Sequence, residues 1–368
     1  MVTEAAVRDS RLAVMPRCAP QIRRLAVVTG PEIYDVAVIG AGPAGLAAAV
    51  SAAADGLKTT VVDAYAAGGS AVASPVIQNY PGFADGVSGA ELTRRIYEQA
   101  KRLGAIFALT TPAVGLSSRG AVRVVTLAEG ATISAHAVVI ATGIAYRTLG
   151  IPSVDKLTGA GVHYADVVSE PAAMAGQEVF IVGATAAAGQ AALDLAKHAT
   201  NVTMVVRAGS IASSVPAGLA KEIDRTRNVR VRVNTQVIEA FGEGRLEGLR
   251  LRHRVSGTTE AARTRSLFVM MGADPNTEWL KGSLLRDEDG YLVTGDDLVP
   301  GRRLPQGWPT ERAPLLLETS VPHVFAAGDV RRGAVRRVSS AILEGSLAIA
   351  LVRQLVRQEA EHGVGAAR

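Results

Sequence analysis

The chain has 368 residues, of which 48% are hydrophobic and 20% are charged. At ~150 residues per domain this length predicts two or three domains, and the apolar fraction excludes wholesale disorder. The net charge of +5 is small for the length and only 4% of the residues are aromatic, which argues against a nucleic-acid-binding protein.

The sequence contains one cysteine, Cys18. A single thiol forms neither an internal disulfide nor a thiolate metal cage, and no spacing of His, Cys and carboxylates predicts a metal. Residues 1–32 show no signal segment and no sustained period, so we expect a loose arm there. The apolar run 36–54 is interrupted by three glycines and a proline, which favours strand, turn and helix over a membrane span. We expect a soluble, cytoplasmic protein.

Strands and helices are predicted to alternate from residue 34 onward. The expected elements of the first half are a strand over 34–40, a helix over 43–54, a strand over 58–63 and a strand over 137–143. Ser88 and Glu91 form a capping box that opens a further helix with one apolar face.

The same strand–turn–helix pattern recurs ~140 residues later, which predicts two domains of doubly wound α/β architecture, both Rossmann-like. The expected elements are a strand and helix over 178–199, strands over 201–207 and 229–233, two more β segments, and a closing strand over 266–272. Toward the C-terminus we expect a hairpin over 287–294 with Asp289-Gly290 in a type I′ turn. A buried strand over 324–329 and a long helix from about Val338 follow.

The first strand–turn–helix carries a dinucleotide-binding fingerprint. Gly40, Gly42 and Gly45 give the spacing GxGxxG, and Asp63 ends the next strand. Gly40 allows a tight turn, Gly42 lets a pyrophosphate approach the backbone, and Gly45 lets helix and strand pack closely. The phosphates would lie on the N-terminus of the helix, and Asp63 would accept a hydrogen bond from a ribose hydroxyl.

Five segments together resemble the low-molecular-weight thioredoxin reductases. They are GAGPAGLAAAVSA from Gly40, NYPGF at 79–83, Ala141-Thr142-Gly143, GADPNTEWL at 272–280 and VFAAGDV at 324–330. The resemblance implies an FAD-binding domain in two parts, an NAD(P)-binding-like domain inserted between them, and a homodimer. The implied boundaries are 33–145 and 273–358 for the FAD domain, 146–272 for the inserted domain and 359–368 for a tail.

The resemblance also implies the residues of an FAD site. Asn79 would lie along the flavin, Asp329 would hold the ribityl–pyrophosphate portion, and the helix from Val338 would direct its positive end at the flavin. The full implied set is Gly40, Gly42, Pro43, Ala44, Gly45, Asp63, Asn79, Ala141, Thr142, Gly143, Gly328, Asp329, Val338 and Ser339.

This chain departs from the family at the redox-active dithiol. Thioredoxin reductases carry Tyr-Cys-x-x-Cys shortly before the second glycine motif, where this sequence has Ala165 and Val168. Reduction of a disulfide through an enzyme dithiol requires two thiolates, so we expect no such chemistry here.

The second glycine motif is incomplete. Gly183 and Ala188 keep its first and third positions, but Thr185 replaces the middle glycine, at a cost of about 1–3 kcal/mol if it crowds a pyrophosphate. Arg207 stands where NADPH-dependent relatives place an arginine for the 2′-phosphate, although a solvated strand end would suit it equally. Residues 208–210 add no basic group. We expect NADPH binding to be weakened or lost.

Without a dithiol, the flavin face is free for a small substrate. Asp166 could remove a proton while hydride moves to flavin N5, or it could be a loop carboxylate in solvent. His163 and Tyr164 could orient the substrate, with packing as the alternative for Tyr164. Arg336 and Arg337 could hold FAD phosphates or an acidic substrate, or form a solvated basic face.

Three functions remain open from the sequence. The favoured one is an FAD-dependent enzyme that oxidises a small molecule and is reoxidised by molecular oxygen or another acceptor. The second is an NAD(P)H-dependent flavin reductase that passes electrons to a ferredoxin, a quinone or an external substrate. The third is a flavin-binding protein without turnover. A role in specialised metabolism is suggested by analogy of fold alone.

Overall fold

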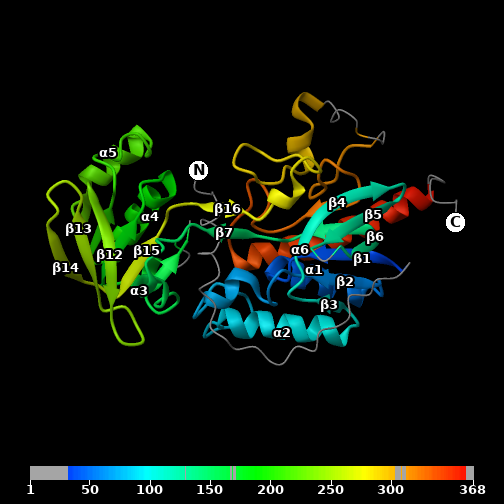
Figure 1. Ribbon diagram of the computed structural model, residues 1–368, viewed down its shortest axis with the longest axis horizontal. Coiled ribbons are helices and arrows are strands. Elements are labelled where there is room, and N and C mark those ends of the chain that lie inside the picture. The colour runs from blue at the N-terminus through cyan, green and yellow to red at the C-terminus, as the bar shows by residue number, and fades with distance from the viewer. Residues whose placement is uncertain are drawn as a thin grey trace, which may run out of the picture. The chain divides into compact units, whose positions relative to one another are not determined.

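The computed structural model describes residues 32–128, 130–165, 168, 171–302, 308 and 312–361 (Figure 1). The described chain forms two compact units: the first unit, residues 32–145 and 274–361, and the second unit, residues 146–273. The expected arm at 1–32 lies outside the described residues except for Glu32, and so does Cys18.

The first unit is built on a parallel sheet with the strand order β3-β2-β1-β6-β17. Its strands are β1 (Ile33–Ile39), β2 (Thr59–Val62), β3 (Ile106–Ala108), β6 (Thr132–Ile140) and β17 (Val324–Ala326), and β4 (Ala113–Arg119) and β5 (Val122–Leu127) add antiparallel to the first part of β6. The strand order reverses between β1 and β6, and doubly wound folds bind dinucleotides at the carboxyl ends of strands at that point.

The helices of this unit are α1 (Pro43–Ala54), α2 (Gly89–Arg102) and α6 (Val338–Glu361). Alternate residues of β1 point to two apolar clusters, with Val36 and Val38 in the cluster that contains α1 and α6, and Ala37 in the other. By length and composition α6 could span a membrane, but it packs closely on α1. A Cβ on Gly345 would lie only 2.0 Å from the carbonyl oxygen of Ala44.

The predicted start of α2 is confirmed, but only half of its capping box forms. The Ser88 side chain accepts a hydrogen bond from the Glu91 backbone N–H at 3.1 Å. The Glu91 carboxylate does not return the bond, because it pairs with Arg94 and Arg95 at 2.9 and 2.7 Å.

The second unit repeats the parallel arrangement in the order β11-β10-β9-β15-β8, beside an antiparallel sheet β12-β13-β14. Its strands are β8 (Val162–Tyr164), β9 (Glu178–Val182), β10 (Asn201–Val205), β11 (Val229–Arg232), β12 (Thr235–Phe241), β13 (Gly248–His253), β14 (Thr259–Arg263) and β15 (Ser266–Val269), and its helices are α3 (Pro152–Asp155), α4 (Ala186–Ala196) and α5 (Ala217–Arg225). The chain enters and leaves this unit along a two-stranded sheet of β7 (Ile144–Tyr146) and β16 (Ala273–Pro275).

Three local expectations need correction. Three strands lie between β11 and β15, where we expected two. The missed strand is β14, which is almost fully exposed and therefore shows no alternation of apolar and polar residues. Residues 287–294 form no hairpin strands and no type I′ turn, since Asp289 does not adopt the positive φ that this turn requires. Instead the Asp287 carboxylate accepts hydrogen bonds from the N–H groups of Asp289 and Tyr291 at 3.1 and 2.8 Å. Finally, α6 runs to Glu361, past the expected boundary at 358.

Candidate dinucleotide-binding sites

The turn between β1 and α1 contains two glycines that the fold itself requires. Gly40 has a φ of +109°, and a Cβ there would lie 2.2 Å from the carbonyl oxygen of Ala141. A Cβ on Gly45 would lie 1.8 Å from the carbonyl oxygen of Gly40. Only glycine allows strand, turn and helix to approach this closely.

Gly42 is a glycine that the fold does not require. Its φ of −75° is open to other residues, and a Cβ there would meet only the Cα of Gly69, at 3.8 Å. No side chain caps α1, and the N–H groups of Ala44 and Gly45 find no hydrogen-bond partner within the described chain. With Pro43 as the first helical residue, this positive helix end forms an open cradle for a pyrophosphate.

The Asp63 carboxylate is fixed beside this cradle. Its two oxygens accept hydrogen bonds from the backbone N–H groups of Ala41 and Tyr65, each at 2.7 Å. Burial raises the pKa of Asp63 above its ordinary value, and these two bonds oppose the rise. Each oxygen keeps a free lone pair, so the carboxylate remains able to accept a hydrogen bond from a ribose hydroxyl.

Asp329, which follows β17, carries an unsatisfied carboxylate. It is half-buried and has no hydrogen-bond partner among the residues that the structure describes. Burial, and next the negative charge of Glu344, raise its pKa to about 6. A shielded carboxylate without a partner is unfavourable in the bare protein, and a ligand rich in hydroxyl groups would satisfy it.

The N-terminus of α6 lies near the NYPGF segment. Tyr80 and Phe83 pack in one apolar cluster with Val338 of the first helical turn. The N–H groups of Val338 and Ser339 have no partner in the described ranges, and the neighbouring Asn79 is exposed. This turn therefore presents free donors and a positive helix end to a ligand.

The Ala141-Thr142-Gly143 segment, which follows β6, is held by Asn276. The Thr142 hydroxyl donates to the Asn276 carbonyl oxygen at 2.9 Å, and the Asn276 side-chain amide donates to the Thr142 carbonyl oxygen at 2.8 Å. Asn79 lies in the loop before α2. The other implied FAD residues of the first unit follow the carboxyl ends of β1, β2, β6 and β17 at one edge of the sheet, or open α1 and α6. The open cradle at α1, the Asp63 carboxylate and the unsatisfied Asp329 carboxylate fit FAD.

The corresponding turn in the second unit is differently built. Gly183 matches Gly40, because its φ is +149° and a Cβ there would lie 2.3 Å from the carbonyl oxygen of Met270. At the middle position the Thr185 hydroxyl accepts a hydrogen bond from the Ala188 N–H at 3.1 Å and caps α4. The Thr185 side chain therefore already accepts the hydrogen bond from a backbone N–H group that a pyrophosphate would otherwise use.

The structure places a second arginine beside Arg207, at the carboxyl end of β10. Arg254, which follows β13, donates from Nη1 to the Arg207 carbonyl oxygen at 3.0 Å. Both side chains are exposed, and neither pairs with a carboxylate in the part of the chain that is described. Two uncompensated guanidinium groups suit a phosphate. No sequence motif links the two positions, so the sequence does not predict a role for Arg254.

The candidate catalytic residues belong to the second unit. His163 stacks on Phe268 with a centroid separation of 5.1 Å, and burial lowers its pKa. The Tyr164 hydroxyl donates to Asp155 at 2.6 Å, and burial followed by this bond raises its pKa well above the ordinary value. These contacts favour the packing alternative for Tyr164. Asp166 lies outside the described residues.

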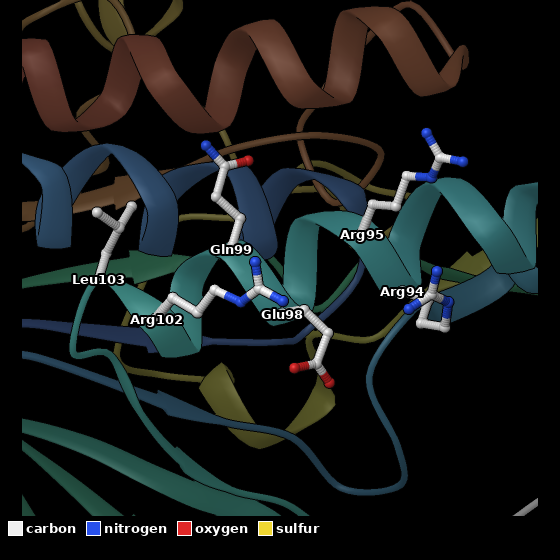
Figure 2. Close-up of a pocket in the computed structure, with 6 residues that line it drawn as sticks. All are labelled: Arg94, Arg95, Glu98, Gln99, Arg102 and Leu103. Atoms are coloured by element: carbon white, nitrogen blue, oxygen red, sulfur yellow. The ribbon is translucent and has the colours of Figure 1, made fainter.

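Three further observations concern the arginines before α6, metal ligation and a surface hollow. Arg336 donates to the Tyr291 hydroxyl at 2.6 Å, whereas Arg337 is exposed. Among the described residues, no His, Cys, Asp and Glu side chains are grouped as a metal ion would need. A hollow of about 420 Å³ lies along α2 (Figure 2). The two arginines at one end of it already pair with Glu91, and we assign it no function.

A chain with two doubly wound units, one with an open cradle for a dinucleotide, is an oxidoreductase of the two-domain flavoprotein class. It belongs to the pyridine nucleotide-disulphide oxidoreductase family, whose sequence profile matches residues 34–345. The expected fold class and the resemblance to thioredoxin reductases are confirmed.

Individual relatives are similar over nearly the whole chain. The thioredoxin reductase of Peptoclostridium acidaminophilum is 31% identical over 336 residues, which cover 90% of this chain and 99% of the relative. That of Streptomyces clavuligerus is 32% identical over 300 residues, 81% of this chain and 86% of the relative. The crystal structure of thioredoxin reductase from Streptococcus pyogenes MGAS5005 matches with a TM-score of 0.78 at 27% identity. The match covers 89% of this chain and 99% of the chain in that structure.

Proposed function

We propose that this protein is an FAD-dependent oxidoreductase that oxidises a small molecule without a redox-active dithiol. The observation that carries the proposal is the replacement of both family cysteines, by Ala165 and Val168. Val168 packs against the apolar core of the second unit. Because the sequence contains only Cys18, it holds no pair of thiols for thiol–disulfide exchange.

The proposed cofactor site is the cradle of the first unit. The N–H groups of Ala44 and Gly45 would bind the pyrophosphate, Asp63 would accept a ribose hydroxyl, and Asp329 would accept hydroxyls of the ribityl chain. The open N-terminus of α6 would stabilise negative charge on the ring system. When bound, FAD supplies a two-electron acceptor.

In the proposed reaction the substrate loses two electrons and two protons. A separate acceptor, molecular oxygen in the simplest case, takes them up and becomes hydrogen peroxide. Asp166 is the proposed base, and His163 could also take a proton, because burial lowers its pKa and keeps the ring neutral near pH 7. Tyr164 is not available as a base near pH 7, because burial and the bond to Asp155 raise its pKa and keep the hydroxyl protonated.

The second candidate is an NAD(P)H-dependent reductase that hands electrons to a ferredoxin, a quinone or another external acceptor. It is favoured by two exposed arginines at the end of β10, since Arg254 donates a hydrogen bond to the backbone carbonyl oxygen of Arg207. The capped helix end at Thr185 argues against it.

Anaerobic mixing of the FAD-loaded protein with NADPH distinguishes the two candidates. The proposal predicts that the flavin absorbance persists with NADPH and with NADH. Rapid, stoichiometric bleaching would reject the proposal in favour of the reductase. A correctly folded protein that is colourless and takes up no added FAD would contradict both.

We also propose a small-molecule substrate, no nucleic-acid partner and a homodimer. The homodimer is what the resemblance to thioredoxin reductases implies. Light scattering of the purified FAD-loaded protein tests this, and a strictly monomeric mass would contradict it.

A further inference from the structure

An ion pair in the first unit joins the loop after β17 to α6. Arg331 donates from Nη2 to Glu344 Oε1 at 2.6 Å and from Nε to Oε2 at 3.0 Å. The two side chains are only 15% and 14% exposed. A two-point pair with so little exposure is weakly screened by salt and has a defined geometry.

The same pair fixes the short segment around Asp329. Glu344 Oε2 accepts a hydrogen bond from the Gly328 N–H at 2.7 Å. Arg331 donates from Nη1 to the Thr294 hydroxyl at 3.1 Å. Gly328 precedes Asp329 and Arg331 follows it closely, and both bond to Glu344, so the segment that carries Asp329 is tied to α6 at both ends.

Glu344 also acts on Asp329 through its charge. Burial is the first cause that raises the pKa of Asp329, and the carboxylate of Glu344 is the second. Arg331 in the same loop neutralises Glu344. Tyr291 also lies near this part of the site. Burial is the main cause that raises its pKa, the charges of Asp289, Asp287, Asp274 and lastly Asp329 add to it, and its hydroxyl accepts a hydrogen bond from Arg336.

We propose that Arg331 and Glu344 are positioning residues for FAD: the pair holds Gly328 and Asp329 where the cofactor meets them. The inference rests on FAD binding as proposed above and adds residues that no motif of the sequence identified. Neither side chain has to touch the cofactor for this role.

The test is a titration of the cofactor-free full chain with FAD between pH 5 and 8, followed by the change in flavin fluorescence. Glu344→Gln keeps the size of the side chain and removes its charge. Arg331→Met removes the guanidinium group. Loss of a charge-assisted hydrogen bond predicts that either variant binds FAD roughly tenfold more weakly at pH 7.5.

The pH dependence distinguishes positioning of Asp329 from general loosening of the loop. The ionised carboxylate is the form that accepts two or more hydrogen bonds from hydroxyls, so affinity rises as pH passes the pKa of Asp329. Glu344→Gln removes a negative charge and lowers that pKa, which moves the midpoint to lower pH. Arg331→Met leaves Glu344 unneutralised and raises the pKa, which moves the midpoint to higher pH.

Two further variants serve as controls. Arg353→Met, further along α6, removes an ion pair with Asp55 that is 2.8 Å long and is expected to leave FAD affinity unchanged. Arg331→Lys keeps the positive charge and is expected to lose less affinity than Arg331→Met, with its midpoint near that of the wild type.

Variants that bind FAD within twofold of the wild type, or midpoints that move in the same direction, would overturn the inference and leave the proposed function standing. A folded wild-type chain that binds no FAD at any pH would instead overturn the proposed function and this inference together.

Discussion

The Thr185 hydroxyl accepts a hydrogen bond from the Ala188 N–H at 3.1 Å, at the place where the first unit has the bare Gly42. We predict that Thr185→Gly raises NADPH affinity about tenfold, because it frees a helix donor and removes a branched side chain. Thr185→Ser, which keeps the cap, should stay within about twofold of the wild type. Calorimetric titration measures both, and equal affinities in all three proteins would contradict the prediction.

Arg254 provides a test of the second site that is independent of Thr185. Because its guanidinium group lies at the Arg207 carbonyl and has no carboxylate partner in the described chain, Arg254→Ala should weaken NADPH binding about tenfold, the effect of one charge-assisted bond. NADH affinity should not change, since NADH has no 2′-phosphate. Arg252→Ala, at an exposed arginine of the preceding strand β13, is the control. An unchanged NADPH affinity in Arg254→Ala would mean that the two arginines form a solvated surface.

The two kinds of glycine in the β1–α1 turn predict different losses. Gly42→Ala should leave the melting temperature of the cofactor-free protein unchanged, because the new Cβ meets only a Cα at 3.8 Å. FAD affinity should fall about tenfold or more as the methyl group crowds the pyrophosphate. Gly45→Ala should instead yield little folded protein, because its Cβ would overlap the Gly40 carbonyl oxygen. Full FAD content in purified Gly42→Ala would contradict this assignment of the cradle.

Asp329 should make the stability of the cofactor-free protein depend on pH. Its pKa is raised from 3.8 to about 6 in the folded state, so the folded protein holds the proton more tightly than the unfolded chain. The contribution is fully present below pH ~4 and is lost as pH rises through ~6, a change on the order of 3 kcal/mol. Asp329→Asn should therefore flatten the decline in urea stability between pH 4 and 6.5, and the exposed Asp297→Asn should not. Parallel curves for wild type and Asp329→Asn would rule this out.

Elements defined by neighbours in sequence could be predicted well. The strand–turn–helix units at Gly40 and Gly183, the start of α2 at Ser88 and the start of α6 at Val338 all lie where the patterns predicted them. Their causes are local: glycine permits the tight turn, a hydroxyl caps the helix, and apolar spacing defines the buried face. The turn near Asp289 was predicted wrongly because the Asp287 side chain competes for the same backbone N–H groups.

By itself, the sequence determined the family, the two doubly wound units and the absence of a cysteine pair, since each depends on residue types at short, fixed spacings. The tertiary structure alone decided that Arg254 lies against Arg207, 47 residues away, and that Glu344 holds Gly328, 16 residues away. Such pairs arise from the packing of separate strands and helices. The periodicity of one segment does not indicate which distant side chains this packing brings together.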